Sequence, residues 1–179
     1  MGDVQRGLSE PVGAHLEPGE VLVAATWADR RDGSANVGGL IAGGLGAKLT
    51  RSPVQDAPQY PGLPGYAGSI PFGYLVVAVT DRRLLVLWAA TTKSPLVPLV
   101  AFGPHDYQKL KVSTAFAATL AITFADNTTV FLDLAGHHKA KAVAKAAFAL
   151  RAAAPPPGPH PGYHPGTYPG QHLGDHPAQ

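Results

Sequence analysis

The spacing of hydrophobic residues predicts mostly strands, and residues 116–124 give the clearest case. Their sequence, FAATLAITF, alternates large apolar with small or polar side chains at the period of two that a half-buried strand requires. A short turn at Asp126 joins this segment to residues 128–134, TTVFLDL, which alternate in the same way. The two segments therefore predict an antiparallel hairpin.

A second hairpin is predicted over residues 74–90, YLVVAVT-DRR-LLVLWAA. Two runs rich in β-branched and aromatic residues flank a tight polar turn at Asp81 and Arg82, which is typical of a hairpin. The next run, PLVPLVAF, contains Pro95 and Pro98. Because each proline removes a backbone donor from the ladder, this run is expected to be an edge strand.

The remaining elements follow from weaker patterns. A strand is predicted over Val21–Asp29 and another over Tyr107–Ser113. One face of the first strand is expected to carry Val21, Val23, Ala25 and Trp27. Before this strand, Ser9 is expected to cap a short helix with Val12 and Leu16 on its apolar side. Residues 137–152 predict an amphipathic helix that buries Ala140, Val143, Ala147 and Leu150.

Seven strands joined mostly by hairpin-length turns predict an antiparallel sheet. Such a sheet must cover its open face or curl, so we expect a mainly β fold, a bent seven-strand roll capped by the C-terminal helix. The short helix belongs to an N-terminal segment, residues 1–19, and the roll to residues 20–152.

Composition divides the chain further, because its 21 glycines and 18 prolines exceed ordinary usage and are concentrated in two places. Residues 33–73 form a Gly/Pro-rich insertion after the first strand, and we expect it to be mobile. Residues 153–179 form a tail with Pro-Gly pairs at a period of four, which suits turns without a core, so we expect the tail to be disordered.

Charge and cysteine content exclude several classes of function. The chain has no cysteine, which rules out disulfides and thiol chemistry, and its formal charge of +2 is too small to favour nucleic acid as a partner. The first twenty residues contain no apolar run typical of a secretory signal, so a cytoplasmic location is expected, with contact to the inner face of the membrane as the alternative. The longest apolar stretch near the Gly-rich segment is too short to span a bilayer.

The segment VVAVTDRRLLVL, preceded by LEPGEVLVA and followed by TLAITFADNTTVFLDL and a helix, resembles the bacterial pleckstrin-homology-like (PH-like) and GRAM domains over about residues 14–152. The resemblance implies a bent roll of seven strands with a C-terminal helix, acting as a non-catalytic adaptor that binds proteins or membrane headgroups. Phosphoinositide readers of that superfamily crowd basic residues at the first hairpin. Here that region mixes both signs of charge: Arg30, Arg31, Lys48 and Arg51 with Asp29, Asp32 and Asp56.

Within the resemblance, Thr80, Asp81, Arg82 and Arg83 form the structural signature of the central hairpin. Two adjacent arginines are also able to grip a carboxylate or phosphate. The structural interpretation is favoured, in which Asp81 accepts backbone hydrogen bonds in the turn, Arg82 is solvated and Arg83 lies along the next strand.

No catalytic constellation, cofactor or specific metal site is predicted. The tail histidines repeat at short intervals and suit weak, adventitious metal binding: His160, His164, His172 and His176. His137 and His138 are expected to be a surface pair at the helix start. The basic helix face, formed by His138, Lys141 and Lys145, is expected to be solvated, because three cations attach only weakly to anionic lipid.

The favoured function is a non-catalytic binding or scaffold module for a protein partner of unknown identity. The partner is expected to contact the insertion, the open end of the roll or the predicted edge near residues 95–100. At the edge a partner strand would add, and the contact residues are Leu96, Val97 and Leu99. The alternative is a peripheral membrane protein that inserts part of the segment VGGLIAGGLGAKL. Its contact residues are Leu40, Ile41 and Leu45, helped by Lys48 and Arg51. The same segment is also interpretable as a flexible or loosely helical loop, or as a phosphate cradle, although it lacks the usual glycine motifs.

Overall fold

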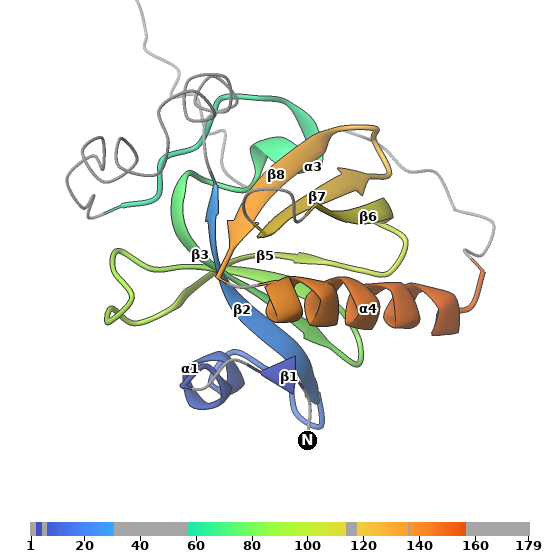
Figure 1. Ribbon diagram of the computed structural model, residues 1–179, viewed down its shortest axis with the longest axis horizontal. Coiled ribbons are helices and arrows are strands. Elements are labelled where there is room, and N and C mark those ends of the chain that lie inside the picture. The colour runs from blue at the N-terminus through green and yellow to red at the C-terminus, as the bar shows by residue number, and fades with distance from the viewer. Residues whose placement is uncertain (1–2, 5–6, 31–56, 114–117, 136, 157–179) are drawn as a thin grey trace, which may run out of the picture.

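The computed structural model describes residues 3–4, 7–30, 57–113, 118–135 and 137–156 (Figure 1). The strands are β1 Asp3–Val4, β2 Leu22–Arg30, β3 Gly73–Thr80, β4 Leu84–Trp88, β5 Val97–Phe102, β6 Tyr107–Ser113, β7 Ala118–Phe124 and β8 Thr129–Leu134. The helices are α1 Ser9–Gly13, α3 Gly65–Gly68 and α4 His137–Ala153.

The strands form one sheet in the order β5-β4-β3-β2-β8-β7-β6, and every pair along this path is antiparallel. The predicted mainly β fold with seven antiparallel strands and a C-terminal helix is confirmed. The sheet does not close, so β5 and β6 lie at its two ends, and the proline-containing β5 is an edge strand as predicted. The short β1 pairs in parallel with β2 and was not predicted.

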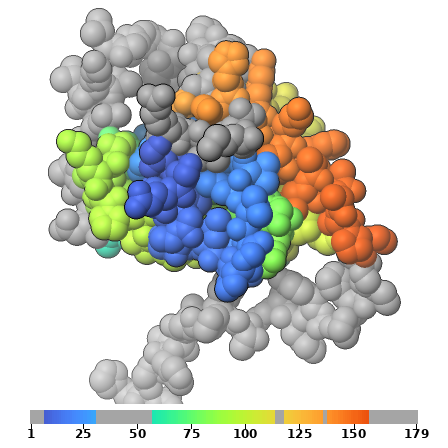
Figure 2. Space-filling model, turned by 90° about the horizontal axis from the view of Figure 1, so that it is seen from below, coloured from blue at the N-terminus to red at the C-terminus, as the bar shows by residue number. Residues whose placement is uncertain are grey.

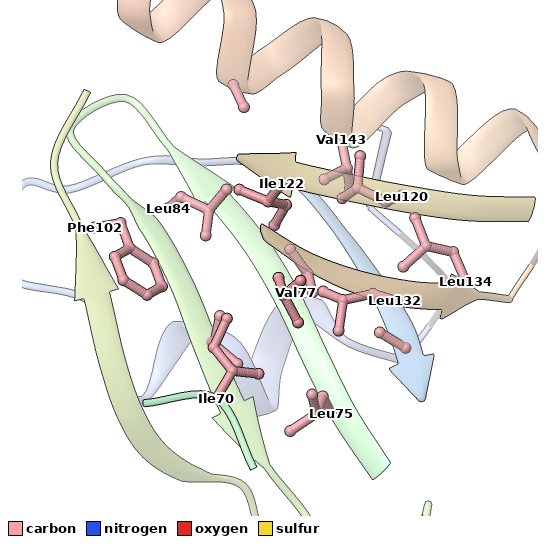
Figure 3. Close-up of a cluster of buried hydrophobic side chains, with 14 of the residues drawn as sticks. Ile70, Leu75, Val77, Leu84, Phe102, Leu120, Ile122, Leu132, Leu134 and Val143 are labelled. Atoms are coloured by element: carbon pink, nitrogen blue, oxygen red, sulfur yellow. The ribbon is translucent and has the colours of Figure 1, made fainter. Parts of the chain in front are cut away.

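One face of the sheet surrounds the main core, in which the inward rows of both predicted hairpins meet (Figure 3). The inward rows include Leu75, Val77, Leu84, Leu120, Ile122, Leu132 and Leu134. Helix α4 covers this core with Ala140, Val143 and Ala147, all fully buried. The buried hydroxyl of Tyr107 donates a hydrogen bond of 2.9 Å to the carbonyl oxygen of Ala147, which ties the helix to β6.

The opposite face of β3 and β4 forms a second, smaller core. Its members include Val76, Ala78, Leu85 and Leu87 from these strands. Leu8 and Val12 cover them from the N-terminal segment, and Leu96 covers them from the loop after β4. From below, the N-terminal residues (blue) lie at the centre of the molecular surface, with α4 (orange) beside them (Figure 2).

Two details of the N-terminal region differ from the prediction. Val21 and Val23 are exposed, with exposed fractions of 59% and 37%, whereas Ala24 and Ala28 point into the main core. A register shift between Leu22 and Ala24 breaks the expected alternation at this point. The predicted Ser9 cap is also wrong, because Leu8 is the N-cap of α1 and no side chain caps the helix.

Residues 57–73 are part of the core, which corrects the expectation of a mobile insertion for this stretch. Ile70 is fully buried, and the Tyr66 ring contacts the rings of Phe102 and Phe124. The buried guanidinium of Arg30, at the end of β2, donates hydrogen bonds to the carbonyl oxygens of Ala67 and Ile70. Short glycine-rich and proline-rich stretches thus pack once a long-range donor satisfies their backbone. The earlier part of the insertion lies outside the described residues.

Candidate binding site

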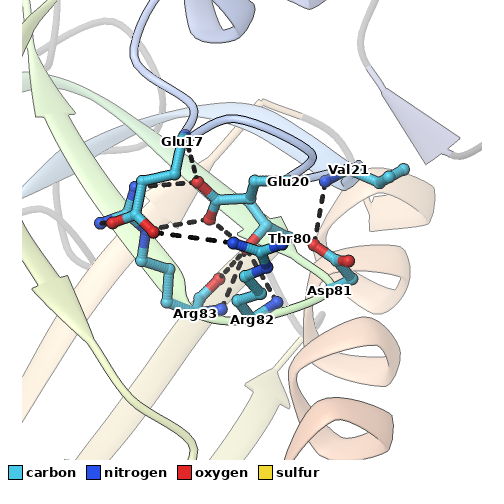
Figure 4. A network of polar contacts seen from close by, with 7 residues as sticks. All are labelled: Glu17, Glu20, Val21, Thr80, Asp81, Arg82 and Arg83. Carbon is cyan, nitrogen blue, oxygen red and sulfur yellow. Dashed lines mark hydrogen bonds and ion pairs between the residues drawn. The ribbon is translucent and has the colours of Figure 1, made fainter.

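The turn between β3 and β4 is fixed by its own side chains (Figure 4). The Thr80 hydroxyl oxygen accepts hydrogen bonds from the backbone N–H groups of Arg82 and Arg83, at 3.1 and 2.9 Å. Asp81 accepts a hydrogen bond of 2.9 Å from the N–H of Val21, which joins the turn to the chain entering β2. Thr80 and Asp81 therefore stabilise the turn and its connection to β2.

Arg83 is held by two glutamates. Its Nε and Nη2 donate to the two carboxylate oxygens of Glu20, at 2.9 and 2.8 Å, and its Nη1 lies 2.8 Å from Glu17. The hydrogen bond to Glu20 raises the pKa of Arg83. Burial alone would raise the pKa of Glu20, but hydrogen bonds from Arg83, the Glu17 backbone and Thr80 outweigh it and lower this pKa to about 2.

These contacts argue against the alternative in which Arg82 and Arg83 together bind an anion. Because the Arg83 guanidinium already makes a two-point contact with a buried carboxylate, it is not available as a free anion clamp. Arg82 is about half exposed and lies 3.8 Å from Glu17, a distance at which a surface ion pair contributes little. The arrangement is that of a structural joint between the N-terminal segment and the central hairpin.

A shallow groove of about 230 Å³ lies beside this joint, on the outer side of β4 and β5. Leu85 and Leu87 of β4 line it, together with residues 98–101 of the edge strand. His15, which follows α1, and Arg83 are its polar members. The groove is therefore a small hollow with mostly aliphatic lining side chains, of which Leu85 and Leu87 are almost fully buried, and it lies directly alongside an edge strand whose outer side pairs with no other described strand.

The predicted edge contacts are only partly brought to this groove. Leu99 lines it and is half-buried, and Val97 has an exposed fraction of 44%. Leu96 is a correction, because it is 7% exposed and packs into the second core beneath β3 and β4. Leu96 lies directly before β5, in the same cluster as Leu8 and Val12 of the N-terminal segment.

The other predicted contacts lie elsewhere. Leu40, Ile41, Leu45, Lys48 and Arg51 lie outside the described residues, as do the four tail histidines. His138 is exposed at the start of α4. Within the described part of the chain, no three His, Asp or Glu side chains gather as a metal ligand set would.

Glu17, Glu20 and His15 were not predicted to belong to the site. Glu20 and Arg83 are 63 residues apart, and no local pattern links them. The only available signal was an isolated acidic pair, Glu17 and Glu20, immediately before a predicted strand. That signal is also typical of solvated charge.

None of the helices in the described ranges is both long and apolar enough to cross a bilayer. No protein-family model matches the chain, and no curated protein matches its sequence.

Proposed function

We propose that the protein is a non-catalytic binding module of PH-like type that receives an extended segment of a protein partner along β5. The observation that carries this proposal is the coincidence of the β5 edge with the aliphatic groove beside it. The antiparallel seven-strand sheet and the C-terminal helix support the resemblance to PH-like domains.

Strand addition uses backbone hydrogen bonds for affinity and side-chain pockets for specificity. β5 supplies an open edge, and the groove supplies a place for one apolar side chain of the added segment. Pro98 has no N–H to donate, so the ladder that a partner strand forms along β5 lacks a donor at this position. This restriction favours a short and selective contact over indefinite edge-to-edge association.

A non-catalytic role is proposed because of the side chains that line the groove. Most of its lining side chains are aliphatic, and the two polar side chains among them are His15 and Arg83. The Arg83 guanidinium is already bound to Glu20, which leaves the imidazole of His15 without a described partner of the kind that a nucleophile or general base requires.

A photo-crosslinking residue placed at Val97 in the full chain tests the proposal in the native cell. We expect Val97 to capture a specific partner, whereas the same residue placed at Phe131, on the outer face of β8 and 52% exposed, does not. With the captured partner purified, Leu99→Lys should weaken its binding at least about tenfold, since a charge in the groove must be desolvated. Equal capture at Val97 and Phe131, or unchanged binding by Leu99→Lys, would contradict the proposal.

A further inference from the structure

Helix α4 exposes an aromatic ring on the side that does not face the core. Phe148 has an exposed fraction of 71%, the largest among the large hydrophobic side chains of the described residues. Lys145 and Lys141 lie three and seven positions earlier, on the same face of the helix, and both are exposed. Ala149 and Ala152 are exposed beside them and are too short to cover the ring.

This ring has no role in packing the helix. The opposite side of α4 holds the helix on the sheet through Ala140, Val143 and Ala147, which are fully buried. Single exposed apolar side chains are common on protein surfaces, so Phe148 indicates a contact surface only together with the charges beside it.

The charge of the helix is one-sided. The cations of α4 are Lys139, Lys141, Lys145 and Arg151, and the helix contains no acidic residue. Lys141 and Lys145 form no ion pair within the described part of the chain. Their positive charge is therefore directed outward and would complement an anionic surface.

The composition of this face favours a bilayer over an acidic protein. Protein interfaces are depleted of Lys and Ala at their centre and need a broad complementary area, about 800 Å² on each partner. The face of α4 consists of Lys and Ala around one ring. A bilayer requires only that a ring enters the headgroup region while long basic side chains reach lipid phosphates.

We propose that the outer face of α4 is a peripheral contact surface for bilayers that contain anionic phospholipid. Phe148 enters the headgroup region, and Lys141 and Lys145 lie over lipid phosphates. With one ring and few cations, the contact is weak and reversible, and it is stronger on an already tethered protein. The basic face of α4 was expected to be only solvated. The proposal differs from that expectation because Phe148 adds an apolar side chain that enters the bilayer.

Flotation of the full chain with vesicles tests this surface. We expect binding to vesicles of phosphatidylcholine with 40 mol% phosphatidylserine, loss of binding on pure phosphatidylcholine, and weakening by salt. Phe148→Ala should lower the partition coefficient by about tenfold. The double variant Lys141→Gln with Lys145→Gln should lower it by about thirtyfold, at roughly fivefold for each cation.

Matched controls separate the surface from general charge and hydrophobicity. Phe131→Ala removes another exposed ring, and Lys109→Gln with Lys111→Gln removes two exposed lysines of β6. Both controls should bind like the wild type, and all variants should keep a cooperative urea unfolding transition.

Three outcomes would overturn the proposal. The first is that the wild-type chain does not bind the anionic vesicles, including the case in which it binds polyglutamate instead. The second is full binding by Phe148→Ala, which would place lipid contact elsewhere in the chain. The third is that the control and test variants lose binding equally.

Discussion

The two halves of the sheet differ in what covers their outer faces. On β3 and β4 the outer face is apolar and lies under the N-terminal segment, with Leu8 and Val12 fully buried against it. On β7 and β8 the outer face carries three threonines, of which Thr123 and Thr129 share a 3.1 Å hydrogen bond, together with Ala121, Asp133 and the exposed ring of Phe131. One half is therefore buried on two sides and the other on one.

This difference is visible in the sequence. β3 and β4 are almost uninterrupted apolar runs, GYLVVAVT and LLVLW, whereas β7 and β8 alternate strictly. A continuous run thus indicates a strand with two covered faces, and an alternating run indicates one. The apolar residues that predict the β3–β4 hairpin therefore also indicate that another segment of the protein covers its outer face.

The largest effect on stability is expected when a side chain of the N-terminal segment that covers β3 and β4 is shortened. Leu8→Ala removes a side chain that is 1% exposed in the second core, and it should destabilise the protein by about 3 to 4 kcal/mol. Phe131→Ala removes a larger side chain from the uncovered half and should cost less than about 1 kcal/mol. Urea denaturation of both variants measures the difference, and equal losses would show that the N-terminal segment does not form a second core.

Acid should loosen the covered half through the joint that holds it. Because the folded pKa of Glu20 lies near 2, below its ordinary value of 4.5, its contribution to stability is complete above pH 4.5 and is lost as the pH falls toward 2. The loss should reach about 3 kcal/mol at an order of magnitude. Urea unfolding across this range measures it.

Glu20→Gln provides the control for this pH dependence. It should be less stable at neutral pH and show a flatter acid slope. The remaining slope includes Asp126, whose pKa is lowered because hydrogen bonds from Thr128 and the Tyr66 backbone outweigh the effect of burial, which alone would raise it. An unchanged slope in Glu20→Gln would exclude the joint as the acid-sensitive element.

A smaller effect is expected where residues 57–73 meet the alternating half. Gly65 has a φ of +75°, and a β-carbon there would lie 2.2 Å from a carboxylate oxygen of Asp126. Gly65→Ala should therefore cost about 2 kcal/mol or more. Gly62 has a φ of +66° with nothing nearby, so Gly62→Ala should cost about 1 kcal/mol. Equal shifts in melting temperature for the two variants would mean that Gly65 does not lie close to Asp126 in the β7–β8 turn.

The smallest effect comes from exchanging the same two residue types between the faces. Thr129→Val on the half-buried outer face of β8 should change stability by no more than about 0.5 kcal/mol. Val76→Thr in the second core, where Val76 is fully buried, should cost about 1 to 2 kcal/mol because a hydroxyl is buried there. Similar changes in the free energy of unfolding, measured by urea denaturation, would show that the outer faces of the two halves are equally buried.

Local sequence predicted the elements whose cause is local. The alternation in residues 116–124, the polar turn at Asp81 and the period of the C-terminal helix each depend on neighbours within a few positions, and the structure confirms the corresponding hairpins and helix in the described range, 118–124 for the first. The two prolines of residues 95–102 likewise indicated an edge strand.

The remaining features depend on distant contacts. Arg30 satisfies the carbonyl groups of a stretch about forty residues later, and Glu20 meets Arg83 after 63 residues. Leu96 is buried in a cluster with residues of the N-terminal segment and of the β3–β4 hairpin. The groove at β5 also combines residues from three separate parts of the chain, and no spacing in the sequence brings them together.

The central place of β2 has a consequence for how the chain is made. β2 pairs with β3 on one side and with β8 on the other, although β8 begins about one hundred residues after β2 ends. At synthesis rates of roughly 5–20 residues per second, the roughly thirty residues between the ends of β5 and β8 take roughly 2 to 6 s to appear. During this interval β1 covers the edge of β2 only at Ala24 and Ala25, so the nascent half-sheet presents the unpaired edge of Ala28–Arg30 until β8 arrives.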